Sequence, residues 1–139
     1  MTTTSGNLHT TARLDELWTP RGPVVMGIIN CTPDSFSDGG RFLDLDQAIR
    51  EAERHIDAGA RIIDIGGEST RPFSDNVTID EEIRRVVPVI ESLAKKVPIP
   101  ISVDTTKAAV AEKALKAGAS IINDISAFKF DPDMVNVAA

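Results

Sequence analysis

Residues 58 to 65 read AGARIIDI, and residues 117 to 125 repeat the pattern as AGASIINDI. In both copies a glycine suited to ending a helix precedes a short apolar run, and a polar residue follows that run. Continuous apolar runs are typical of strands buried in a parallel sheet. The repeat therefore predicts stacked βα units in an α/β protein, with each helix leading back to the next parallel strand.

Four such strands are expected along the chain. Their ranges are Val24–Ile29, Arg61–Ile65, Ile101–Val103 and Ser120–Asn123. Chemically varied residues follow the strands, and the carboxyl ends of parallel strands meet at the same edge of a sheet. We therefore expect the polar residues after the strands to gather on one face. They are Asn30, Glu68 to Arg71, Asp104 and Asn123.

Polar residues with capping chemistry mark where the helices between the strands begin. The expected caps are Asp44, Thr78 in a capping box with Glu81, Thr105 or Thr106, and Asp131 followed by Pro132. Gly59 and Gly118 are expected to end two of these helices, and Pro88 should kink the helix that follows Thr78. The apolar residues between caps and stops recur at helical spacing, so each helix has one face for the sheet.

Composition narrows the range of functions. The net charge of −6 at pH 7 argues against nucleic acid or an anionic membrane as the partner. A single cysteine, Cys31, fits a reducing compartment such as the cytoplasm, and a small apolar filler is its favoured role. No apolar run approaches the roughly 18 residues of a membrane span. Residues 1–22 form a polar lead-in without the apolar core of a signal peptide.

The loop after the first strand is the richest in chemistry. Residues 30 to 40 read NCTPDSFSDGG, which combines an amide, two carboxylates, hydroxyls and an aromatic ring before two glycines. Turn formation requires Pro33 and the glycines but does not require Phe36. Long ordered loops after strands are usually functional. The loop is therefore interpreted as part of a binding or catalytic site.

Four motifs in order resemble the dihydropteroate synthase family. They are the loop at residues 30–40, GGESTRP at residues 66–72, VDT at residues 103–105 and IINDI at residues 121–125. The resemblance runs from about Val24 to the end of the chain. It implies the first half of a TIM (β/α)₈ barrel, with residues 1–22 as the lead-in and 23–139 as the pterin-binding half-barrel.

The resemblance also implies a reaction. Members of the family condense a 7,8-dihydropterin methyl pyrophosphate with 4-aminobenzoate and release pyrophosphate in folate biosynthesis. Mg²⁺ would assist the leaving group, and Asn30 corresponds to the family's metal neighbour. Asp38 and Arg71 correspond to the residues that act together when the first two loops close. Thr70 would contact substrate, and Phe36 and Pro72 could wall a flat aromatic pocket.

Two residues have functional interpretations of their own. Asp104 ends an apolar strand, where its carboxylate could accept parallel hydrogen bonds from a pterin edge or could cap the next helix. Asn123 has a donor and an acceptor, so it could read the same heterocycle or be satisfied within the protein. Asp124 lies on the other side of the pleat, where capping or structural pairing is expected. His55 lies on a helix with no evident partner.

Other interpretations stay open. A methyltetrahydrofolate methyltransferase would share the strand-end Asp and Asn but does not need the first loop. A non-catalytic half-barrel would bind pterin weakly or associate with a second half. Four parallel strands leave two open edges, so we expect a homo-oligomer and little activity from this chain alone. Phe73 stands where the family usually has glycine, which leaves the second loop's path and the aminobenzoate pocket in question.

Overall fold

A computed structural model describes residues 14–17, 22–32, 45–69, 72 and 76–139. Four strands form one parallel sheet in the order β1-β2-β3-β4. The strands are β1 (Met26–Asn30), β2 (Ile62–Gly66), β3 (Ile101–Asp104) and β4 (Ile121–Asn123). Each neighbour in the sheet is also the next strand along the chain, which is how a (β/α)₈ barrel begins. The expected parallel α/β fold is confirmed.

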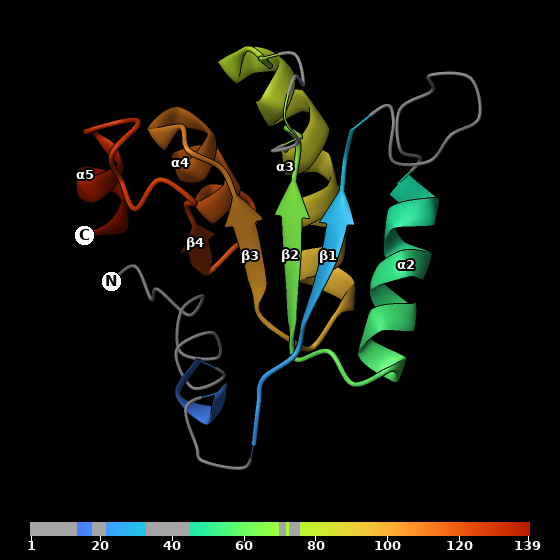
Figure 1. Ribbon diagram of the computed structural model, residues 1–139. Coiled ribbons are helices and arrows are strands. Elements are labelled where there is room, and N and C mark those ends of the chain that lie inside the picture. Colours follow the sequence, from blue (N-terminus) through green and yellow to red (C-terminus); the bar gives the residue numbers. More distant parts are fainter. Residues whose placement is uncertain (1–13, 18–21, 33–44, 70–71, 73–75) are drawn as a thin grey trace, which may run out of the picture.

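Helices connect the strands and pack on one face of the sheet, with the other face toward the viewer in Figure 1. They are α2 (Leu45–Asp57), α3 (Ile79–Lys96), α4 (Ala108–Ala117) and the short α5 (Met134–Ala138). On the helix-facing side the strands contribute isoleucines and valines. On the other side Ile28 is 55% exposed, whereas its helix-facing neighbour Ile29 is 1% exposed. The sheet therefore has one covered face and one that is open along β1.

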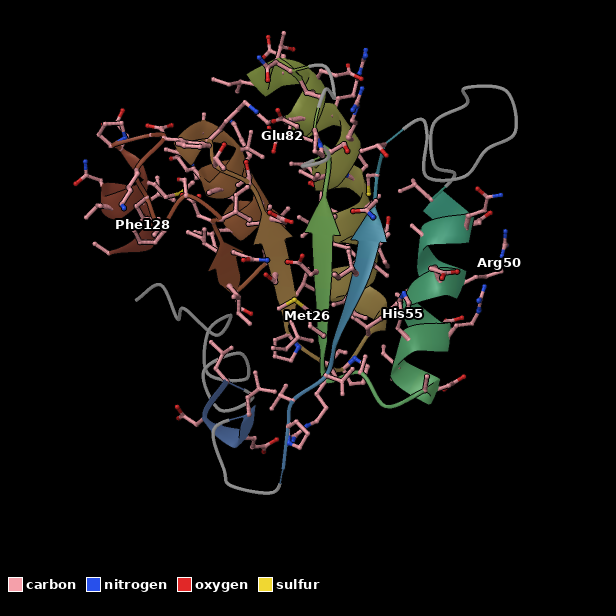
Figure 2. All side chains as sticks on the ribbon, viewed as in Figure 1. Met26, Arg50, His55, Glu82 and Phe128 are labelled. Atoms are coloured by element: carbon pink, nitrogen blue, oxygen red, sulfur yellow. The ribbon has the colours of Figure 1, made fainter. Side chains whose placement is uncertain are left out.

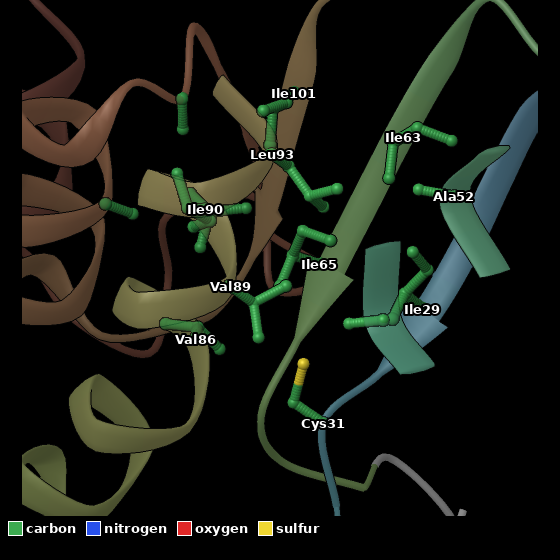
Figure 3. Packing of buried hydrophobic residues seen from close by; sticks show 14 of the residues in the cluster. Ile29, Cys31, Ala52, Ile63, Ile65, Val86, Val89, Ile90, Leu93 and Ile101 are labelled. Carbon is green, nitrogen blue, oxygen red and sulfur yellow. The ribbon is translucent and has the colours of Figure 1, made fainter. Parts of the chain in front are cut away.

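The core lies between the sheet and helices α2 and α3 (Figure 3). Figure 3 shows Ile65 of β2 beside Val89 of α3, and Ile63 of the same strand beside Ala52 of α2. The three-and-four spacing of α3 buries Val86, Val89, Ile90 and Leu93 as one stripe. Leu45 and Ile79, at the starts of their helices, are exposed although they share the apolar spacing. The first residue of each of these helices thus lies outside the buried stripe.

Helix ends agree with expectation in part. The hydroxyl of Thr78 accepts the backbone N–H of Glu81 at 3.2 Å, so the predicted cap of α3 is confirmed. Gly59 and Gly118 have φ values of +109° and +126°, which explains why glycine ends α2 and α4. Pro88 lies inside α3 as predicted. Asp44 lies outside the described residues.

Two predicted caps are wrong. Helix α4 begins at Ala108 after Lys107, and Thr105 instead accepts the backbone N–H of Lys107 at 3.2 Å. Asp131 does not start α5, which begins at Met134 after Asp133. One oxygen of Asp131 accepts the N–H of Asp133 at 3.1 Å, and the other accepts the N–H of Ala108 at 2.8 Å. Asp131 therefore caps α4, a helix that precedes it in the sequence.

The described part of the lead-in is a helical segment at residues 14–17. Leu17 is buried, and the Arg61 guanidinium donates to the carbonyl of Glu16 at 3.3 Å. Within the described ranges, no helix combines the length and apolar character needed to cross a membrane.

Candidate active site

Four residues form a row across the carboxyl ends of the strands. In the strand register Asn30 pairs with Gly66, Gly66 with Asp104, and Asp104 with Asn123. Residues paired at one level of a parallel sheet point to the same face. A Cβ on Gly66 would lie 3.5 Å from the Cβ of Asp104 and 3.9 Å from Oδ1 of Asn30. The glycine thus leaves open space between the Asn30 amide and the Asp104 carboxylate, and the predicted gathering of these residues is confirmed.

A second carboxylate lies one layer below this row. Asp64 pairs with Ser102 in the ladder and is 1% exposed. The side-chain amide of Asn123 donates to its two oxygens at 3.4 and 3.5 Å. Burial raises the pKa of Asp64, and the neighbouring Ser102 hydroxyl and Asn123 amide oppose this rise. Sequence reasoning missed Asp64, although it occupies the position of Asn123 in the first copy of the repeat.

Asp104 has an unusual protonation equilibrium. Burial, followed by the charges of Asp64, Glu82 and Asp124, raises the pKa of Asp104 to about 6. A raised pKa in a cleft is typical of residues that bind or exchange protons with a ligand. The Asp104 carboxylate is therefore poorly satisfied by the described residues and suited to a ligand that donates hydrogen bonds.

A pocket of about 480 Å³ opens beside Asp104. Its apolar walls include Ile125 and Phe130, which are 61% and 74% exposed. Its polar walls include Glu68, Glu82 and Lys107. This pairing of apolar walls with a few polar groups suits a small organic ligand. Ile125 and Phe130 were missed from the sequence because each follows a strand end in an otherwise ordinary connection.

Lys107 joins two carboxylates at the edge of this pocket. Its ammonium hydrogen bonds to Glu68 and also to Glu82, whose oxygen is 2.7 Å away. Burial lowers the pKa of Lys107, but these hydrogen bonds outweigh it and the pKa is raised. Figure 2 labels Glu82 near the amino end of α3. Lys107 and Glu82 had been assigned no role from the sequence, and Glu82 was missed because acidic residues in a first helical turn are usually solvated. Glu68 was expected only to lie among the polar residues that follow the strands.

Several predicted site residues cannot be compared with the geometry. Asp38, Phe36, Thr70 and Arg71 lie outside the described residues. Pro72 is described and exposed. Their predicted roles remain predictions.

The remaining candidates have structural roles. Cys31 is buried, and burial raises the pKa of its thiol to about 12, so it acts as a core filler as expected. Asp124 accepts hydrogen bonds from the Ser126 backbone and hydroxyl and from the Phe128 backbone, which confirms its structural role. His55 lies on α2 facing β1 (Figure 2), with Nε2 3.7 Å from a Glu51 oxygen.

The residues of the row can be tested for fit to Mg²⁺. Among the described residues, no group of three or more His, Cys, Asp or Glu side chains could hold a metal ion. Asn30 is exposed at the end of β1 and offers one neutral oxygen beside the gap left by Gly66. A single amide oxygen fits an ion that keeps most of its ligands as water and substrate phosphate, which is the usual style of Mg²⁺.

Comparison with known proteins decides the family. The model of the pterin binding enzyme family matches residues 26–139. The chain belongs to this family. Residues 26–139 of this pterin-binding chain include every element of the sheet and the whole row from Asn30 to Asn123.

Relatives of the pterin-binding chain include dihydropteroate synthase from Bacillus subtilis, 62% identical over 116 residues, which cover 84% of this chain and 41% of that protein. A Clostridium difficile dihydropteroate synthase solved in the presence of pteroic acid is 54% identical, with a TM-score of 0.80 over 84% of this chain and 44% of that one. A Xanthomonas albilineans dihydropteroate synthase solved with 4-aminobenzoic acid is 47% identical, with a TM-score of 0.79 over 86% and 44%. The chain thus spans less than half the length of these relatives.

Proposed function

We propose that this chain supplies the pterin-binding part of a dihydropteroate synthase. The single observation that carries the proposal is the row in which Asp104, with a raised pKa, stands between Gly66 and Asn123 at the carboxyl edge of the sheet. The substrates would be 6-hydroxymethyl-7,8-dihydropterin pyrophosphate and 4-aminobenzoate. The similarity to dihydropteroate synthases over residues that contain this row supports the assignment.

The row would bind the pterin through complementary hydrogen bonds. The pterin 2-amino group and the adjacent ring N–H are two donors on one edge, and the ionised Asp104 carboxylate can accept both. Because the Asn123 amide nitrogen donates to Asp64, its oxygen is the part of the amide available to accept from the ligand. Ile125, on the wall of the same pocket, supplies an apolar contact for the flat ring.

The chemistry needs no covalent nucleophile. The aminobenzoate nitrogen forms a bond to the exocyclic CH₂ of the pterin, the C–O bond to pyrophosphate breaks, and the amine loses a proton. Asn30 would hold Mg²⁺ together with pyrophosphate oxygens and water, and the ion would supply positive charge to the leaving group. Asp38 would place negative charge near the carbon as it becomes cation-like, and Arg71 and Thr70 would contact substrate.

The test is a pyrophosphate-release assay on a full-length enzyme. A suitable enzyme joins this chain to the remaining strands of the Bacillus subtilis relative, since the two are 62% identical where they overlap. We expect pyrophosphate release that requires both substrates and a dihydropteroate product. Pterin binding without pyrophosphate release would support a non-catalytic pterin protein instead. Methyl transfer from methyltetrahydrofolate would support the methyltransferase interpretation.

A further inference from the structure

We propose that Lys107 is a positioning residue that fastens the stem of the second loop, residues 66–69, to helices α3 and α4. It would thereby set how that loop enters the site described above, so the proposal rests on the proposed function. Lys107 would not touch the reacting atoms. Its effect would be transmitted through Glu68.

The first observation is the buried carboxylate of Glu82. Its side chain is 1% exposed, although it lies in the acidic first turn of a helix. A buried charge is tolerated only when it is paired and hydrogen bonded. Lys107 supplies that pair at 2.7 Å, which ties the start of α4 to the start of α3. The buried charge of Glu82 therefore already has its partner in Lys107, without any contribution from Glu68.

The second observation is the additional bond from Lys107 to Glu68. Glu68 does not belong to either helix: it lies two residues beyond the end of β2, in the connection to α3. Its side chain is 25% exposed, so burial alone does not require the pairing. The extra bond instead restricts where the loop stem can lie relative to the helices.

The stem is held at a second point by close packing. The Arg85 guanidinium donates to the carbonyl of Gly67 at 2.9 Å. A Cβ on Gly67 would lie 2.8 Å from Cγ1 of Val86, so the stem touches α3 too closely for a larger residue. Two anchors on successive residues, Gly67 and Glu68, fix both the position and the direction of the stem.

The third observation connects the stem to the ligand site. Asp104 and Lys107 are separated by two residues, and both line the same pocket with Glu68 and Ser69. Movement of the Lys107 ammonium would therefore displace the second loop relative to the carboxylate that reads the pterin. A displacement of about 1 Å between reacting partners can cost on the order of a hundredfold in rate.

The test uses Glu68→Gln in the full-length enzyme, which removes the negative charge at the loop end of the tie and leaves the Lys107–Glu82 pair intact. We expect kcat/KM for 4-aminobenzoate to fall by about tenfold or more, while the dissociation constant for pterin pyrophosphate stays within about twofold. Lys107→Met combined with Glu82→Gln should likewise lower kcat/KM for 4-aminobenzoate and leave the dissociation constant for pterin pyrophosphate nearly unchanged. The double variant removes the charges of the pair together, so neither is left without its partner. Lys116→Met is the matched control, since that lysine on α4 pairs with Glu112 at the surface.

Two readouts separate positioning from simple stability. Amide exchange at residues 67–69 should become about tenfold faster in Glu68→Gln and stay unchanged in Lys116→Met, whatever the enzyme's activity. Glu68→Gln should also lose most of its effect when Arg71 is already alanine, because both act through the same loop. Unchanged amide exchange at the stem in Glu68→Gln would overturn the proposal. So would a loss of kcat/KM in the double variant that equals the product of the losses in Glu68→Gln and Arg71→Ala. Absence of turnover in the unmutated enzyme would instead refute the proposed function.

Discussion

Asn123 of β4 donates its side-chain amide to the carboxylate of Asp64 on β2, with Nδ2 3.4 Å from Oδ2. The strand between them is β3, which carries Asp104. A buried acid thus fixes the orientation of a neighbouring amide, and its charge adds to the burial that raises the pKa of Asp104. If the row binds the pterin as proposed, recognition would depend on a residue that lies beneath the row.

Asp104→Asn should abolish pterin recognition in the full-length enzyme. The amide places an N–H against a donor edge and loses the charge assistance of the carboxylate. We expect a loss of about 2–4 kcal/mol in binding free energy, as for a broken charged hydrogen-bond pair. Calorimetry with a pterin pyrophosphate analogue measures it. Asp80→Asn, at an exposed position in the first turn of α3, is the control. Unchanged pterin affinity in Asp104→Asn would refute the assignment of Asp104 as a pterin-binding residue.

Pterin affinity should rise with pH through about 6. The pKa of Asp104 is raised to about 6, so the ionised, accepting form becomes dominant above that pH. Asp64→Asn should move the midpoint to lower pH, since the charge of Asp64 helps to raise this pKa. Binding titrations between pH 5 and 8 give the midpoint for each protein. An equal midpoint in the unmutated enzyme and in Asp64→Asn would contradict an effect of the Asp64 charge on the pKa of Asp104.

Folding stability should respond to pH in the opposite direction. A folded pKa above the unfolded value means that the folded state binds the proton more tightly. The contribution of Asp104 to stability is therefore present at low pH and is lost as the pH rises through about 6. Urea unfolding of the enzyme and of Asp104→Asn at pH 5 and pH 7 checks this: the stability difference between the two proteins should change between the two pH values.

Gly118→Ala should destabilise the protein more than Gly59→Ala. Both glycines have positive φ, so alanine is strained at either position. A Cβ on Gly118 would also lie 2.5 Å from the Cβ of Ala94, whereas nothing lies within 4 Å of one on Gly59. We expect about 1 kcal/mol of loss at Gly59 and a further 1–3 kcal/mol at Gly118. Ala94→Gly should recover part of the second loss, and equal losses at the two glycines would show that the contact is unimportant.

The 139-residue chain by itself should associate and turn over little or no substrate. The open face of β1 exposes Ile28 at 55%, and β1 and β4 are both edges of the sheet. Ile28→Lys should reduce association measured by light scattering, and Ile79→Lys on the exposed start of α3 should not. A monomeric chain that releases pyrophosphate at a normal enzymatic rate would refute the expectation.

Local patterns explain what the sequence predicted correctly. The Thr78 cap and the glycine stops depend on neighbours within a few residues. Asn30, Asp104 and Asn123 share one level because each ends its own strand of the parallel sheet. The misassigned role of Asp131 has a different origin, because its partner Ala108 lies 23 residues away. Glu82 resembled an ordinary exposed acid of a first turn, and only packing against Lys107 and Gly67 distinguishes it.

The cap that Asp131 gives to Ala108 has a consequence for how the chain is made. The first turn of α4 remains unfinished until the ribosome has added the segment that includes residue 131 and that segment has folded back. The third and fourth βα units are therefore completed together rather than one after the other. A split or circularly permuted version cut between these two units should separate α4 from Asp131, the residue that caps its first turn. A cut before α3 would leave both units whole.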